Sequence, residues 1–197
     1  LFSGHFQTAI YVFLAAFIFL GLSFKNNPNL KSLIKIITCF VLGILIASPQ
    51  ILPSMEFAKF SARDFDQGYY SGRVDWFIPL KHLIQIIAPD FFGNPTTLNY
   101  WGIWNYGEFV SYFGIVPLSL ALFSIFYTTK VKSAHFFTVI FGLSLLLGLQ
   151  NPISKIPYIF NFPIVSSMQP SRIIFLLVFS GSCLAAIGLD LFMREKK

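Results

Sequence analysis

Long runs of apolar residues separated by short polar links dominate the chain. Five such runs cover residues 6–24, 33–52, 109–127, 134–149 and 173–193. A helix needs about 20 apolar residues to cross the hydrocarbon core of a bilayer, and the fourth run is the shortest of the five. Because backbone polar groups cannot stay unpaired in lipid, these runs should be helices. The pattern therefore predicts an all-α, polytopic membrane protein with about five transmembrane helices.

The composition agrees with this pattern. The chain is 55% hydrophobic and only 11% charged, whereas a water-soluble domain carries about 25% charged residues. Most of the surface should therefore face the lipid bilayer, and we expect a multi-pass protein of the cell membrane. Residues 1–197 should form a single membrane domain. Since the first residue is Leu, we also expect this sequence to be a fragment of a longer protein.

The charged residues predict which ends of the spans share a side. Basic residues without neighbouring acids mark the links after the first and third spans, and the tail after the fifth is also basic: Lys25, Lys31, Lys35, Lys130, Lys132, Arg194, Lys196 and Lys197. With five spans these segments share one side, which the positive-inside rule makes cytoplasmic. The net charge of +6 is then a bias of that face. It is poor evidence for nucleic-acid binding, because no basic stripe alternates with stacking aromatics.

A long segment, residues 53–108, is expected on the outer side. Its start continues the second span as a helix, on which Glu56, Lys59 and Arg63 share a face because they are three and four residues apart. Short amphipathic helices and loops should follow, lying on the outer face and covering a cavity. Six of the eight acidic residues fall in this segment: Glu56, Asp64, Asp66, Asp75, Asp90 and Glu108.

Two motifs near the membrane boundary each have a functional and a plain interpretation. Pro49 and Pro53 should kink a helix and free backbone carbonyls, so Gln50 and Glu56 could line a cavity or pathway. The alternative is a proline-marked exit from the membrane, with Glu56 paired to a nearby cation. His5 could carry a proton or bind a phosphate; otherwise it is an interfacial residue that caps the first helix.

The segment around residues 99–108 is rich in aromatic and polar side chains. Tyr100, Trp101, Asn105 and Glu108 could bind a sugar, with rings stacking on its apolar face, or could form an ordinary aromatic belt at the interface. Asp90, in a Pro- and Gly-containing turn, could hold a metal or act as a base, but one carboxylate is not a site.

The start of the fifth span offers a capping residue and a cation. Ser171 could cap the helix. Arg172 could grip a phosphate with two donors, or snorkel to the interface. Neither cysteine has zinc-site spacing, and no nucleotide-binding motif is present. The sequence gives no sign of a cofactor. A divalent metal is possible, but no motif supports one.

Several motifs, taken in order along the chain, resemble the bacterial YfhO-type membrane proteins. They are Gly4-His5-Phe6-Gln7, Pro49-Gln50 to Pro53, residues 56–63, the block from Tyr100 to Glu108, Tyr112-Phe113-Gly114, Pro117-Leu118, Pro170-Ser171-Arg172 and Gly188-Leu189-Asp190. Position 6 departs from the family pattern, which has Pro there. YfhO-type proteins are similar to GT-C glycosyltransferases, membrane enzymes that take sugar from a polyprenyl-phosphate carrier at the outer face.

The resemblance implies that the intact protein transfers a sugar to an acceptor outside the cytoplasm. The catalytic carboxylate of such enzymes lies in a first outer loop, which we expect upstream of this fragment, so no catalytic residue is assigned. Arg63 or Arg172 would offset charge on the leaving phosphate. Glu56, Glu108, Tyr100, Trp101 and Asn105 would orient sugar or acceptor. The alternatives are a transporter or flippase for a lipid or polar solute, and a non-catalytic membrane scaffold.

Overall fold

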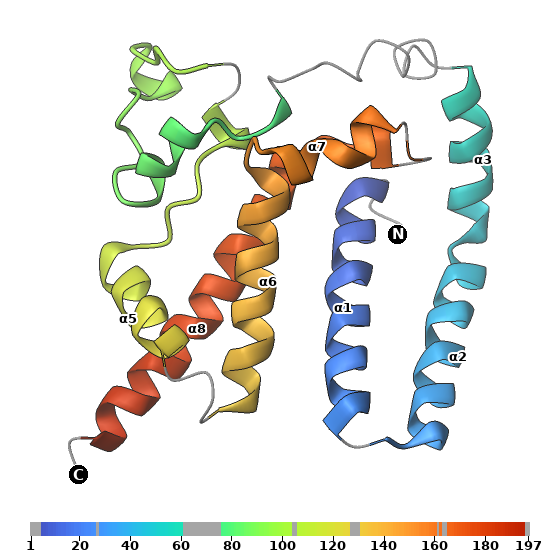
Figure 1. The fold of residues 1–197 in the computed structure, drawn as a ribbon. Helices are drawn as coiled ribbons and strands as arrows, with labels where there is room; N and C mark the ends of the chain where they lie inside the picture. The colour runs from blue at the N-terminus through green and yellow to red at the C-terminus, as the bar shows by residue number, and fades with distance from the viewer. Residues whose placement is uncertain are drawn as a thin grey trace. The chain divides into compact units, whose positions relative to one another are not determined.

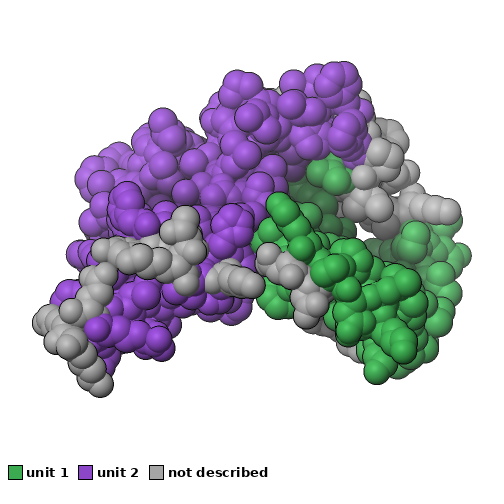
Figure 2. Space-filling model, turned by 60° about the horizontal axis from the view of Figure 1, so that its bottom comes forward, with its two compact units in different colours: residues 1–71, 163–168 green, residues 72–162, 169–197 purple. Residues whose placement is uncertain are grey.

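The computed structural model describes residues 5–26, 28–60, 76–103, 106–126, 131–160, 162 and 165–195. Within these residues the chain is helical, and its β-type pairing is limited to a single bridge between Ile78 and Leu149. The chain divides into two compact units (Figure 2). Unit 1 comprises residues 1–71 and 163–168, and unit 2 comprises residues 72–162 and 169–197.

Unit 1 is built on a helical hairpin that continues into a third helix. The helices are α1 (Phe6–Asn26), α2 (Leu30–Ile46) and α3 (Ser48–Lys59). The side chain of Asn29 accepts a hydrogen bond from the Ser32 N–H (3.2 Å) and so caps α2. The ring of Phe40 on α2 lies 5.5 Å from that of Phe13 and 5.4 Å from that of Phe17, so aromatic contacts join the two arms.

A bend of 60° separates α2 from the stretch Ser48–Phe57. Pro49, two residues after the break at Ala47, lacks the N–H group that would continue the ladder of α2, whereas Pro53 lies inside α3. The predicted kink is present at this place. The predicted helical continuation extends to Lys59, while Arg63 lies outside the described residues.

Unit 2 is centred on α8 (Ile174–Glu195), which packs against both α5 (Ile115–Phe126) and α6 (Lys132–Gly148) (Figure 1). The shared core includes Ala121, Phe141, Leu177 and Leu184. A Cβ at Gly181 would meet the Phe113 ring and one at Gly188 the Leu120 carbonyl, so α8 and α5 run in the same direction. Helix α6 follows α5 in the sequence. Its last residue, Gly148, lies next to Ile173, directly before α8.

Residues 76–103 and 106–111, here called the cap, lie over the end of this bundle where α6 ends and α8 begins. The cap contains three short 3₁₀ helices, Leu80–Ile86, Pro95–Thr97 and Tyr106–Glu108. Its Ile78 N–H donates to the Gly148 carbonyl (2.9 Å), and the Gln150 N–H donates back to the Ile78 carbonyl (3.2 Å). The predicted short helices and loops are therefore present in the described part of residues 76–108, and they dock on the bundle by backbone pairing.

The remaining helices lie between α6 and α8 in the sequence. Helix α7 (Pro152–Ile159) begins directly after the bridge, and Asn151 caps it by accepting from the Ile153 and Ser154 N–H groups at 2.9 Å each. Two 3₁₀ turns, Val165–Ser167 and Pro170–Ile173, precede α8. The second turn and α8 form one continuous apolar stretch, Pro170–Arg194.

The structure shows a part of the five predicted spans. Two described helical stretches, Phe6–Lys25 and Pro170–Arg194, are long and apolar enough to cross a membrane, and the bent pair α2 and α3 is a third if counted as one span. The prediction of a helix over residues 109–127 is wrong at its start, because α5 begins at Ile115. Gly114, with φ of 106°, takes a conformation that suits glycine and interrupts a helix there.

We predict that Gly188→Ala loosens the packing of α5 on α8. The new methyl group would collide with the Leu120 carbonyl, and overpacking of this kind costs about 1–3 kcal/mol. Gly142→Ala on α6 is the matched control, because a Cβ there meets nothing within 4 Å and alanine favours a helix by about 1 kcal/mol. Thermal unfolding in detergent, followed by circular dichroism, should give a lower midpoint for the first variant only. Equal midpoints would contradict this packing.

Candidate functional site

An ion pair joins the cap to the start of α8. Glu108 ends the 3₁₀ helix Tyr106–Glu108, and its Oε1 lies 3.3 Å from Nε of Arg172. The side chains are 20% and 31% exposed, respectively, so water screens this pair less than a surface pair. Sequence analysis proposed both residues for a site but did not pair them. The contact between the two side chains holds the guanidinium at the cap.

Ser171 does not cap α8, contrary to the sequence prediction. Helix α8 begins at Ile174, after the 3₁₀ turn Pro170–Ile173. Ser171 is fully buried, and its hydroxyl oxygen accepts a hydrogen bond from Nε2 of Gln169 (2.8 Å). The polar side chain is therefore satisfied by its neighbour and positions the turn that carries Arg172.

Asp90 is the centre of a small polar cluster in the cap. Its Oδ1 accepts hydrogen bonds from the Tyr106 hydroxyl (2.7 Å) and from Nδ2 of Asn94 (3.0 Å). The hydrogen bond to Asp90 raises the pKa of Tyr106, and burial and the charge of the carboxylate act in the same direction. Among the described residues no group of three or more His, Cys, Asp or Glu could hold a metal ion. The geometry gives Asp90 an organising role in the cap.

Tyr100 and Trp101 lie next to this cluster. The Tyr100 ring is 5.6 Å from that of Tyr106, and its hydroxyl donates to the Ile103 carbonyl (3.0 Å). Burial raises the pKa of Tyr100. Trp101 packs on Phe92 at 4.9 Å between ring centres and remains 67% exposed. Trp101 is thus held against the cap while much of its indole stays accessible to a ligand or to lipid.

Sequence analysis missed His82, whose side chain is fully buried. Its Nδ1 lies 2.7 Å from Oε1 of Gln85, and its ring stacks on Phe92 (4.2 Å) and contacts Phe109 edge-on (5.0 Å). Burial lowers the pKa of His82; the hydrogen bond to Gln85 opposes this shift, and the positive charge of Lys81 adds to it. The signal in the sequence was two polar residues three apart, His82 and Gln85, within the otherwise apolar segment 82–87.

The predicted residues of unit 1 make local contacts. Nδ1 of His5 lies 3.3 Å from the Thr8 N–H nitrogen at the start of α1, as the capping interpretation predicts. Nε2 of Gln50 donates to the Ser54 hydroxyl (3.4 Å), and that hydroxyl donates to the Gln50 carbonyl (2.7 Å). Glu56 is exposed on α3. Asn105, like Arg63, lies outside the described residues.

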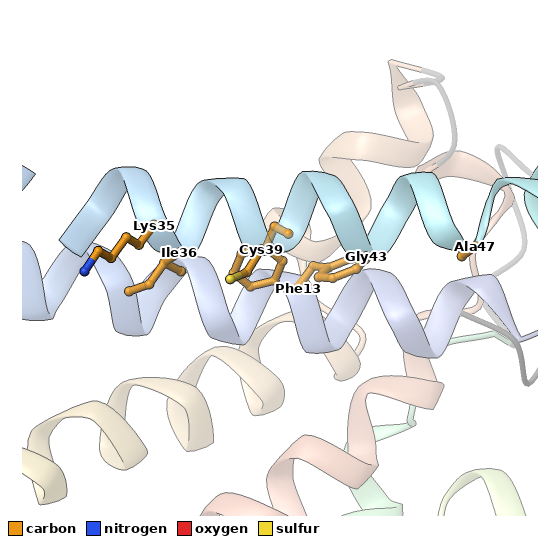
Figure 3. A pocket seen from close by; sticks show the side chains of 7 residues that line it. Phe13, Lys35, Ile36, Cys39, Gly43 and Ala47 are labelled. Carbon is orange, nitrogen blue, oxygen red and sulfur yellow. The ribbon is translucent and has the colours of Figure 1, made fainter. Parts of the chain in front are cut away.

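A hollow with a volume of about 490 Å³ lies between α1 and α2 (Figure 3). Its lining is mainly apolar, with the Lys35 side chain toward one end: Phe13, Lys35, Ile36, Cys39, Phe40, Gly43 and Ala47. The size suits a small organic molecule. These walls offer no acid–base pair, so the hollow is suited to an apolar group rather than to catalysis.

No family model, curated protein or solved structure matches the chain. In unit 2 the structure brings Asp90, Tyr100, Trp101 and Glu108 into one cap and pairs Glu108 with Arg172. This arrangement can present rings, carboxylates and a guanidinium to a polar ligand.

We predict that Glu108→Gln destabilises the docking of the cap. Loss of a partly buried charge pair should reduce the free energy of unfolding by about 1 kcal/mol. Asp190→Asn is the matched control, because Asp190 and Arg194 form an exposed pair (2.9 Å) within one helix, whose loss costs about 0.5 kcal/mol or less. Denaturant titration of the purified protein measures both values. Equal losses would show that the cap does not depend on this ion pair.

Cap stability should also depend on pH through His82. Because the folded pKa lies below 6.5, the unfolded cap binds a proton first as the pH falls. The stabilisation is complete above pH 6.5 and is lost as the pH drops from there toward the folded pKa. Hydrogen exchange of residues 76–90, corrected for intrinsic rates, should therefore quicken from pH 7.5 to about pH 5.5.

Two variants separate this effect from general acid sensitivity. His82→Gln should abolish the part of the pH dependence that comes from residue 82. His135→Gln should retain the wild-type dependence, because His135 is exposed on α6. A wild-type pH dependence in the His82 variant would refute the assignment.

Proposed function

We propose that the chain forms part of a membrane glycosyltransferase-like protein of the GT-C, YfhO-like type. The intact protein would move sugar from a polyprenyl-phosphate donor to an acceptor outside the cytoplasm. The observation that carries this proposal is the cap, in which Asp90, Tyr100, Trp101 and Glu108 gather at one end of a helical bundle. Rings beside carboxylates suit a sugar, because its apolar face stacks and its hydroxyls form hydrogen bonds.

The proposal includes five spans and an outward-facing cap. Helix α5 has 12 residues and covers about 18 Å, less than the hydrocarbon core of about 30 Å. The six residues before it would add at most about 20 Å if they were fully extended. Non-helical backbone is tolerated at membrane depth where protein buries it, and Phe109 and Ser111 are buried.

We infer the sidedness from the basic residues of the sequence. The start of α6 with the link before it, and the end of α8 with the tail after it, contain Lys130, Lys132, Arg194, Lys196 and Lys197, whereas the cap and the turn before α8 contain Lys81 and Arg172 beside the acids Asp90 and Glu108. By the positive-inside rule the basic end is cytoplasmic and the cap is outside. A donor lipid phosphate at the outer interface would then meet the cap.

We assign roles only to binding. Trp101 and Tyr100 would contact the sugar, while Asp90 and Glu108 would orient its hydroxyls directly or through their partners. Arg172 would face a phosphate in competition with Glu108, so the ion pair sets the position of the guanidinium. The catalytic carboxylate is expected on another part of the protein, and His5, Gln50, Glu56, Arg63 and Asn105 stay candidate binding residues.

The test incubates the full-length protein with radiolabelled polyprenyl-phosphate sugars and measures transfer and donor binding. Trp101→Ala should weaken substrate binding about ten-fold, the loss expected for an aromatic contact of about 1.4 kcal/mol. Leu98→Ala is the control, because Leu98 lies in the same cap and is 92% exposed. Absence of transfer, with unchanged donor binding in Trp101→Ala and Arg172→Ala, would refute the proposal.

A transporter or flippase for a lipid or polar solute is the second candidate. The bend between α2 and α3 and the hollow between α1 and α2 favour it, because broken helices beside a cavity are typical of transporters. Movement of a labelled lipid across vesicles containing the protein, without sugar transfer, would support this function instead.

A further inference from the structure

A small cavity lies beneath the cap in unit 2. About 10 Å³ is available to the centre of a water-sized sphere, which is close to the space needed for one water molecule. Three polar side chains, those of His82, Ser111 and Ser144, share its wall with seven apolar residues: Ile78, Leu83, Ile86, Leu145, Leu149, Ile174 and Leu177. The cap, α6 with the residue that follows it, and α8 therefore form the wall.

The hydrogen bonds around Gln85 fix which nitrogen of His82 carries the proton. Nε2 of Gln85 donates to the Pro89 carbonyl (3.1 Å), so Oε1 of the same amide is left to accept. Oε1 lies 2.7 Å from Nδ1 of His82, which must then be the protonated nitrogen of the neutral ring. Nε2 of His82 is consequently an acceptor with a lone pair.

This acceptor is buried and has no hydrogen-bond partner among the residues that the structure describes. His82 is fully buried, and an unsatisfied buried polar atom costs considerably more than a typical hydrogen bond contributes. Ser144 cannot serve as the donor in its observed geometry, because its hydroxyl donates to the Ile140 carbonyl (2.8 Å). Its oxygen, however, can still accept a hydrogen bond from a molecule in the cavity.

We propose that this cavity binds one water molecule, which donates one hydrogen to Nε2 of His82 and the other to a serine hydroxyl oxygen. The volume excludes an organic ligand, and the wall contains no carboxylate that would attract a metal cation. The water satisfies the lone pair and links the cap to the membrane-facing bundle. This site is independent of the proposed transfer of sugar.

The test uses the double variant His5→Gln with His135→Gln, which leaves His82 as the sole histidine of the three. In ¹⁵N-histidine-labelled protein, the ring shifts at neutral pH should show a protonated Nδ1 and a bare Nε2. Magnetisation transfer should connect the ring to a bound water. A protonated Nε2, or no transfer from water, would overturn the proposal.

A pair of matched variants locates the water. Ser111→Val should fill the cavity and abolish the water contact of His82. Ser180→Val places the same substitution at a buried serine of α8 that does not line the cavity, and whose hydroxyl bonds its own helix (2.6 Å to the Leu176 carbonyl). The contact should persist in this control. Persistence at wild-type strength in Ser111→Val would place the water elsewhere and refute the site.

Discussion

The pairing of Ile78 with the end of α6 is the interaction on which the cap depends. Ile78 donates to Gly148 and accepts from Gln150 through its backbone, in a place where its side chain is buried. Backbone polar groups that leave water must find partners, because an unpaired group costs several kcal/mol in an apolar setting. The two hydrogen bonds pair both the N–H and the carbonyl of Ile78. They also fix where the cap meets the bundle.

The polar chemistry of the cap follows from this anchor. With Ile78 fixed, the short 3₁₀ helix Leu80–Ile86 turns His82 and Gln85 inward. His82 in turn supports the rings of Phe92 and Phe109. Phe92 carries Trp101, and Phe109 directly follows Glu108. A chain of packed side chains thus connects the buried anchor to the exposed rings and charges that we propose for ligand binding.

Small residues make the bundle beneath the cap possible. Gly181 and Gly188 let α8 approach Phe113 and Leu120 closely, and serines with hydroxyls bonded to their own helix occupy other interior positions. Close approach through small residues is how helices associate in lipid, where apolar burial alone gives little driving force. This is consistent with an all-helical protein whose most apolar stretches face a membrane.

The sequence predicted the elements whose cause is local. Residues 6–24 fall within α1, and Pro49 lies beside the bend after α2, because helix length and proline geometry act within a few residues. The predicted start of α5 was wrong, because the break at Gly114 depends on the backbone conformation of that one residue.

The candidate site could be predicted only in part. The residues Glu108 and Arg172 were identified, but they are 64 positions apart, and their pairing depends on the docking of the cap. His82 was missed because its burial is a tertiary property. A single polar residue in a short apolar segment does not show whether it will face water or the interior.

In the proposed topology, the cap and the Arg194 end of α8 lie on opposite sides of a membrane. Single cysteines at Leu98 and at Arg194, in a background with Cys39→Ser and Cys183→Ser, test it with a membrane-impermeant thiol reagent on intact cells. The account predicts labelling of the cysteine at position 98 and labelling at position 194 only after the membrane is opened. Labelling of both positions from the same side would contradict it.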